Sequence, residues 1–315
     1  MFSAQKSCGS RKGAFARALQ KEWRQYRYVY LMAIPMIVYY ILFCYMPMYG
    51  ASIAFKDFVP KLKIAGSPWV GFKHFRSFFQ SVYFTRLLTN TLALSLGNLV
   101  FGFPAPIILA ILLNEVRQNW FKRTVQTISY LPHFISVMVI CGMIVDFTAS
   151  GGVINDLLSL FGFKRQTMLL NPSLFRPIYI ISEIWQSVGW GSIVYLAALT
   201  AVDPALYEAA RIVGAGKFRQ ILHVTLPGIA PTIVVMLILK MGSMMSVGSE
   251  KVLLLYNSNT YSTADVISTY VYRKGLLENN FSFSTAVGLF NSVINFTLVV
   301  LANQISRKVN DTSLW

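Results

Sequence analysis

The sequence predicts an all-α membrane protein with six transmembrane helices and with both termini in the cytoplasm. Of its 315 residues, 55% are hydrophobic and only 13% are charged, whereas soluble domains carry about 25% charged residues. A run of about twenty apolar residues can cross a hydrocarbon core of about 30 Å as a helix. Six such runs occur, at residues 28–49, 91–113, 125–147, 177–202, 228–247 and 283–305. Some of them are interrupted by proline, which membrane helices tolerate where neighbouring helices satisfy the freed carbonyls.

Basic residues predict the orientation of these spans. The first 27 residues hold seven Lys and Arg against a single acid, Glu22, and the flank of the first span usually decides the topology. With this tail in the cytoplasm, the inner side receives fifteen of the 28 Lys and Arg, the outer side receives twelve, and Lys240 lies within a span. Six spans then return the C-terminal tail, residues 306–315, to the cytoplasm.

The N-terminal tail, residues 1–27, has the pattern of an interfacial helix. Aromatic and apolar side chains recur at helical spacing into the start of the first span, with Lys and Arg on the other faces, which favours a helix lying on anionic lipid. The apolar positions are Phe15, Leu19, Trp23, Tyr26 and Tyr30. A lipid-facing tail explains the net charge of +16, and no nucleic-acid-binding pattern accompanies it.

A polar interruption at residues 203–227 separates the fourth span from the fifth. Asp203 is placed to cap a helix that starts at Pro204, where a missing N–H costs nothing. Gly214 and Gly216 suit a backbone reversal with positive φ, and a second short helix is expected from residue 217 to about residue 224. An apolar stripe of Leu206, Ala209, Ala210 and Val213 is predicted for the first helix.

The sequence Glu208-Ala209-Ala210, followed by Gly214 and then Leu226-Pro227, resembles the EAA loop of membrane permeases in binding-protein-dependent ABC importers. In that family, the loop is a cytoplasmic coupling helix that docks into a cleft of the ATP-hydrolysing subunit. The alternative is an ordinary amphipathic loop helix. The resemblance implies a type I importer permease core over residues 28–305 and a coupling role for Glu208, Ala209, Ala210, Arg211, Gly214 and Lys217.

Further stretches resemble the polysaccharide-type branch of the sugar permeases, among them PMYG at residues 47–50, AFKDF at 54–58 and SPWVG at 67–71. This resemblance implies a second homologous permease subunit, two ATPase subunits and an extracytoplasmic solute-binding protein, in the bacterial cytoplasmic (inner) membrane. The implied substrate is an oligosaccharide or polysaccharide, with an acidic uronate glycan such as alginate favoured. The outer loops carry twelve basic residues against about five acids, which suits an anionic glycan or an acidic binding protein.

The chain itself is predicted not to be an enzyme. It lacks the GxxxxGK[ST] phosphate loop, so ATP and magnesium are expected on the partner ATPase and no cofactor on this chain. It also lacks a Cys/His cluster for metal. The sequence leaves two alternatives open, an ABC permease for another small solute and an ion-coupled secondary carrier that uses Asp146, Glu183 and Lys240 as a relay.

Polar residues inside the spans are candidates for a substrate path. Charged groups at membrane depth cost about 2.5–3.5 kcal/mol on insertion scales, so each is expected to face a partner or a wet cavity. Glu183 and Lys240 lie at similar depths and are predicted to pair or to line the same cavity. The alternative is a structural ion pair that holds the bundle. The candidate path residues are Asp146, Glu183, Gln186, Trp190, Tyr195, Lys240, Ser243 and Glu250.

Overall fold

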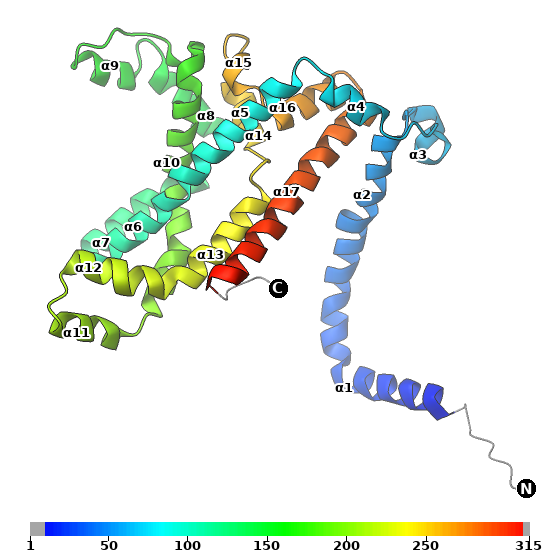
Figure 1. Cartoon of the computed structure of the whole chain (residues 1–315), viewed down its shortest axis with the longest axis horizontal. Helices are drawn as coiled ribbons and strands as arrows, with labels where there is room; N and C mark the ends of the chain where they lie inside the picture. Colours follow the sequence, from blue (N-terminus) through cyan, green and yellow to red (C-terminus); the bar gives the residue numbers. More distant parts are fainter. Residues whose placement is uncertain (1–9, 311–315) are drawn as a thin grey trace, which may run out of the picture.

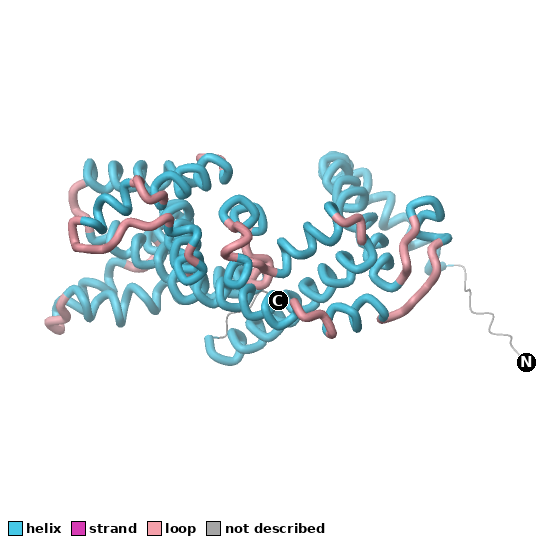
Figure 2. The backbone as a smooth tube through the Cα atoms, turned by 90° about the horizontal axis from the view of Figure 1, so that it is seen from above, coloured by secondary structure: helices cyan, strands magenta, loops and turns pink. Residues whose placement is uncertain are grey.

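The computed structural model describes the backbone of residues 10–310 and the side chains of residues 25–308. Within this range, the chain consists of helices joined by short loops, and its only β pairing is an isolated bridge between Lys56 and Trp69 (Figure 2). The predicted all-α class is confirmed. The tail positions Phe15, Leu19 and Trp23, which were predicted to face lipid, lie outside the described side chains.

The first half of the chain contains two long helical rods and several short outer helices. Its elements are α1 (Ser10–Tyr40), η1 (Ile41–Tyr45), α2 (Met46–Met48), η2 (Tyr49–Phe55), η3 (Pro60–Leu62), α3 (Lys63–Gly66), α4 (Lys73–Phe79), α5 (Phe84–Gly97), η4 (Asn98–Gly102), α6 (Pro104–Glu115), α7 (Asn119–Tyr130), η5 (Leu131–Phe134), α8 (Val137–Thr148) and α9 (Val153–Ser159).

The second half contains three long helices. Its elements are η6 (Met168–Leu170), α10 (Pro172–Thr200), α11 (Pro204–Ile212), α12 (Lys217–Gln220), η7 (Ile221–Thr225), α13 (Leu226–Gly242), α14 (Ser249–Leu255), α15 (Tyr261–Ala264), α16 (Ile267–Tyr272), η8 (Arg273–Leu277) and α17 (Phe281–Asn310).

Six helical segments are long and apolar enough to cross a membrane, if one bent pair is counted as a span. Five are unbroken helical stretches, and the sixth is α10 together with α11, which meet at an angle of 72°. The unbroken stretches are Gln25–Phe55, Phe84–Glu115, Val137–Ser159, Lys217–Gly242 and Phe281–Lys308. The number of predicted spans agrees with this count, but the bounds predicted for the third and the fifth span are wrong.

The third predicted span, residues 125–147, is not one helix. Pro132 lies in the short helix η5, and Ile135 and Ser136 then adopt extended backbone before α8 begins. Proline cannot donate an intrahelical hydrogen bond and clashes with the preceding turn. The chain therefore changes direction between α7 and α8 (Figure 1).

The fifth predicted span ends at Gly242 rather than at residue 247. The backbone after it is non-helical, a costly arrangement in a membrane unless protein groups satisfy the freed amides and carbonyls. Two side chains bond to this backbone: the side-chain oxygen of Asn295 in α17 accepts from Met245 N at 2.8 Å, and Ser95 Oγ in α5 donates to the carbonyl oxygen of Met244. The amide of Asn295 also donates to the Ser246 side chain at 3.0 Å. The predicted second helix of the polar loop begins at Lys217 as expected, but its predicted end is wrong, since α12 runs through η7 into α13 as one helical stretch.

Three of the long helices contain a π turn two residues before a proline. The turns η1, η4 and η7 end at Tyr45, Gly102 and Thr225, and Pro47, Pro104 and Pro227 follow. A proline in a regular α-helix would remove a hydrogen bond and strike the carbonyl four residues earlier, and a π turn widens the helix at that place. These turns let the helices continue through the prolines.

The helices form a bundle whose two ends carry different elements (Figure 1). The turn between α11 and α12 and the C-terminal end of α17 lie at one end, and α4, α9 and α15 lie at the other. Helix α1 stands apart from the bundle, and its apolar part is almost wholly exposed. If the N-terminal tail lies in the cytoplasm, which remains a prediction, the α11–α12 end lies on the same side.

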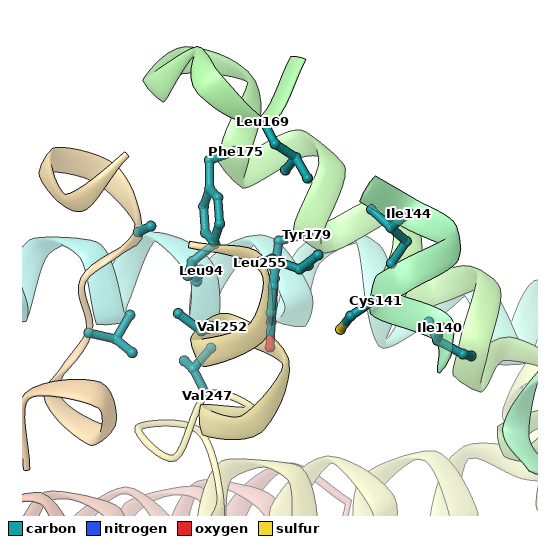
Figure 3. Packing of buried hydrophobic residues seen from close by; sticks show 12 residues of the cluster. Leu94, Ile140, Cys141, Ile144, Leu169, Phe175, Tyr179, Val247, Val252 and Leu255 are labelled. Carbon is teal, nitrogen blue, oxygen red and sulfur yellow. The ribbon is translucent and has the colours of Figure 1, made fainter. Parts of the chain in front are cut away.

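The bundle is held by close packing around α10. Figure 3 shows Phe175 and Tyr179 of α10 among apolar side chains of α5, α8 and α14, including Leu94 and Val252. Lower on α10, Gly189 lies so close to α7 that an added Cβ would be 2.1 Å from the carbonyl oxygen of Ser129. Only glycine fits at this crossing.

Candidate functional site

A polar cavity lies where α5, α10 and the end of α13 meet. Its volume is about 210 Å³. Three of the predicted path residues line it, namely Glu183, Lys240 and Ser243. The prediction that Glu183 and Lys240 share a cavity is therefore confirmed by the geometry, while their role in transport stays a prediction. The loop 243–248 forms much of the remaining wall.

The partner of Glu183 is Lys251, which was not among the predicted path residues. Lys251 Nζ lies 3.1 Å from Glu183 Oε2 and donates to Gln186 Oε1, also at 3.1 Å. The side chain of Lys251 is only 4% exposed, against 29% for Glu183. The predicted alternative of a Glu183–Lys240 ion pair is wrong, because α13 ends early and α14 folds back to bring Lys251 against α10.

A local signal for Lys251 exists in the sequence. In α14, Lys251 shares a helix face with Leu255 and adjoins Val252, and all three are buried. A lysine within an apolar helix face is expected to need a buried partner. This pattern distinguishes Lys251 from the solvated charges of the outer loops.

Of the other predicted path residues, Gln186 shares Lys251 with Glu183, and the rest do not line the cavity. Asp146 is exposed on α8 and Glu250 is exposed on α14. Tyr195 is buried in an apolar cluster of α6, α10 and α13. Trp190 is stacked on His133, with ring centroids 4.6 Å apart and an interplanar angle of 4°, so one ring face already has a protein partner.

The predicted coupling residues gather at the opposite end of α13. Glu208, Arg211 and Lys217 line a groove of about 380 Å³, together with residues 114–117 from the end of α6. Lys217 forms an ion pair with Glu115, which ties α12 to that end. Ala209 is exposed and Ala210 is half-buried on α11.

The turn of this loop has the predicted geometry at one glycine. Asp203 caps α11 by accepting a hydrogen bond from Ala205 N at 2.9 Å. Gly214 has a φ of 77°, in the left-handed region that favours glycine. The prediction for Gly216 is wrong, since its φ is −67° and it serves as the extended residue before α12.

The tip of the loop exposes apolar side chains around these polar residues. Ile212 is 87% exposed, Val213 86% and Phe218 78%. Leu206, on the predicted apolar stripe, is also exposed. A helix pair with exposed apolar groups and flanking charges has the composition of a protein-docking surface.

A second buried polar cluster lies in the outer part of the bundle. Asp265 is fully buried and forms ion pairs with Arg86 at 3.1 Å and Arg273 at 2.7 Å. Its other carboxylate oxygen accepts from Thr269 Oγ1 at 2.9 Å, and its backbone carbonyl accepts from the amide of Asn90 at 3.0 Å. The hydrogen bonds and charge of Asp265 raise the pKa of Arg273 despite the burial of that side chain. The cluster joins α5 to the chain around α16.

Among residues 25–308, no group of three or more His, Cys, Asp and Glu side chains is arranged to hold a metal ion.

Comparisons with known proteins agree with this architecture. The family described as "Binding-protein-dependent transport system inner membrane component" matches residues 102–311. The polygalacturonan/rhamnogalacturonan transport system permease protein YteP of Bacillus subtilis (strain 168) is 49% identical over 92% of this chain and 91% of its own length. Protein LplB of the same organism is 46% identical, again over 92% and 91%.

Two solved structures have the same fold over nearly the whole chain. A crystal structure of a bacterial ABC transporter involved in the import of the acidic polysaccharide alginate matches with a TM-score of 0.86 and 45% identity, covering 93% of this chain and 99% of that one. A bacterial alginate ABC transporter in complex with an alginate pentasaccharide-bound periplasmic protein matches with a TM-score of 0.87 and 44% identity, over 94% and 99%. The chain therefore belongs to the family of binding-protein-dependent transport system inner membrane components, as a permease subunit of an ABC importer for sugars.

Proposed function

We propose that this permease carries an oligosaccharide or polysaccharide into the cytoplasm, and that its substrate is an acidic uronate glycan such as alginate. The observation that carries the proposal is the likeness at 45% identity, over 93% of the chain, to a subunit of a transporter that imports the acidic polysaccharide alginate. The relative named for polygalacturonan transport supports the same class, because polygalacturonan is also a uronate polymer.

In this proposal, ATP hydrolysis on partner subunits drives transport through the loop at residues 203–227. A bound ATPase shifts the bundle between inward-facing and outward-facing states only if it contacts the two states differently. Helix α11 is the favoured contact, because Glu208 and Arg211 flank exposed apolar groups at the tip. The ion pair between Lys217 of α12 and Glu115 of α6 would transmit a movement of the loop to α6.

The proposed assembly contains a second homologous permease, two ATPase subunits that bind ATP and magnesium, and an extracytoplasmic solute-binding protein, all at a bacterial cytoplasmic membrane. The exposed apolar face of α1 supports further contacts with lipid or with the second permease. The solved alginate transporter bound to its periplasmic protein supports the binding-protein partner.

Purification of the tagged chain from its native membrane in mild detergent tests the assembly. Co-purification of a second six-span permease and a P-loop ATPase in stoichiometric amounts is the expected result. A chain that purifies alone and still transports would refute the assembly and favour an ion-coupled carrier. Uptake of uronate oligosaccharides by the reconstituted complex then tests the substrate.

Charge reversal in the loop tests the coupling. The variant Glu208→Lys is expected to lower ATP-driven uptake by about tenfold or more, within the usual range of coupling energies, while the complex stays in the membrane. The control Glu278→Lys reverses an exposed charge outside the loop and is expected to transport normally. Normal uptake by the Glu208→Lys variant would contradict the coupling role of this loop.

A further inference from the structure

The polar cavity contains one carboxylate and one ammonium group with different surroundings. Glu183 is paired with Lys251. Lys240 is half-buried at the last turn of α13 and lines the same cavity, yet it has no ion-pair or hydrogen-bond partner for its ammonium group among the described residues. The cavity wall thus carries an unbalanced positive charge.

The burial of Lys251 keeps its ammonium group paired with Glu183. An almost fully buried ammonium group must remain close to its counter-ion, and Lys251 has both Glu183 and the amide oxygen of Gln186 at 3.1 Å. The ring of Tyr179 also lies within 5.8 Å of its ammonium nitrogen. Glu183 is thereby neutralised as a charge, while its remaining lone pairs can still accept hydroxyl hydrogen bonds.

An unpaired ammonium group inside a bundle is costly unless a counter-ion occupies the space beside it. The remaining lining suits a sugar, because Asn98, Ser243 and Ser246 add polar side chains to the wall. A neutral sugar would leave Lys240 without a partner, and a cationic sugar would be repelled. A carboxylate on a sugar ring satisfies both the charge and the hydroxyl-binding groups.

We propose that Lys240 is the specificity residue that binds a uronate carboxylate as the glycan passes through the bundle, and that Lys251 serves to cancel the charge of Glu183, which would otherwise repel that carboxylate. This inference rests on the proposed function and adds to it a residue that reads the charge of the substrate.

The test compares a uronate oligosaccharide with its methyl ester, which has the same backbone and no charge. The complete importer, with its binding protein, is reconstituted in liposomes, and uptake of each glycan is measured. Every variant uses the same binding protein, so a change in the ratio of the two uptake rates belongs to the permease.

The variant Lys240→Met is expected to lower uptake of the acid by about tenfold, the usual value of one charged hydrogen bond, and to change uptake of the ester by less than about twofold. Lys240→Arg is expected to restore preference for the acid. The control Lys61→Met removes an exposed outer charge and is expected to leave the ratio unchanged.

Four outcomes would overturn the inference. Equal loss of both glycans in Lys240→Met, in a complex that retains all its subunits, assigns Lys240 a structural role. Unchanged uptake of both glycans in Lys240→Met, or an equal change of ratio in Lys61→Met, removes the specific contact. A wild-type importer that moves neither glycan refutes the proposed function together with this inference.

Discussion

Lys251 Nζ and Glu183 Oε2 lie 3.1 Å apart and join α14 to α10 at the wall of the polar cavity. The pair is asymmetric, because the lysine is almost fully buried and the carboxylate is partly exposed to the cavity. The buried lysine therefore needs the carboxylate as a partner more than the carboxylate needs the lysine. This asymmetry predicts different consequences for the two single substitutions.

Glu183→Gln is expected to destabilise the complex more than Lys251→Met. The first leaves a buried ammonium group without a counter-ion, which costs about 3–5 kcal/mol in comparable buried pairs. The second leaves a carboxylate that the cavity can hydrate. Thermal inactivation of the detergent-purified complex measures the difference, and the double variant Glu183→Gln/Lys251→Met is expected to recover most of the loss. Equal destabilisation by both single variants would show that the cavity does not hydrate Glu183.

Asp265→Asn is expected to destabilise the outer part of the bundle by about 3 kcal/mol or more. It leaves Arg86 and Arg273 close together without the carboxylate that both contact. Asp156→Asn breaks the exposed ion pair with Arg165 instead and, as the matched control, is expected to cost less than about 1 kcal/mol. Proteolysis of the loop around α15 and α16 in the intact membrane reports the local loosening. Equal sensitivity of the two variants would contradict a structural role for the buried cluster.

Gly189→Ala is expected to destabilise the crossing of α10 and α7 by about 1–3 kcal/mol, the usual cost of overpacking. The new methyl group would meet backbone atoms of Ser129 and Tyr130, which cannot move aside as a side chain can. Gly142→Ala is the control, because no atom lies within 4 Å of the Cβ position there. Midpoints of thermal inactivation compare the two variants. A normal midpoint for Gly189→Ala would mean that α7 moves freely away from α10.

The ion pairs of Asp57 with Lys73 and His74, which join the segment after η2 to α4, are expected to weaken only in acid. Hydrogen bonding to Lys73, together with the charges of Lys73 and His74, lowers the pKa of Asp57 against the opposing effect of burial. A lowered folded-state pKa adds stability that is present above the ordinary aspartate pKa of about 3.9 and is lost as the pH falls through the folded value. Melting temperatures of wild type and Asp57→Asn are measured between about pH 3 and pH 7, a range that includes the ordinary aspartate pKa. The wild type should melt at a higher temperature at neutral pH, and the two melting temperatures should converge at the acid end. A constant difference throughout would contradict this assignment.

The helices and the polar loop at residues 203–227 could be predicted from the sequence, because both depend on local features. Apolar runs of sufficient length predicted the spans, and a side-chain cap at Asp203 and a positive φ at Gly214 followed from residue type. The EAA-like spacing placed Glu208, Arg211 and Lys217 at one surface, where the structure also has them.

The errors arose where distant parts of the chain decide local structure. The loop after α13 is stabilised by Asn295, some fifty residues later, which accepts a hydrogen bond from Met245 N. Because α13 ends early, α14 folds back against α10, and Lys251 rather than Lys240 is the partner of Glu183. Asp265 was counted with the outer loops, and only the folded chain brings Arg86 and Arg273 to it.

The π turns before Pro47, Pro104 and Pro227 also fix the rotational setting of the helices. Each such turn holds one residue more than an α-turn would, and one residue corresponds to a rotation of about 100° about the helix axis. Within the continuous helix from Lys217 to Gly242, the turn at Ile221–Thr225 therefore sets the azimuth of α12 relative to α13. Deleting one residue there would swing Lys217 away from Glu115 while leaving the length of the span almost unchanged. The orientation of the tip between α11 and α12 therefore depends on a residue count as well as on that contact.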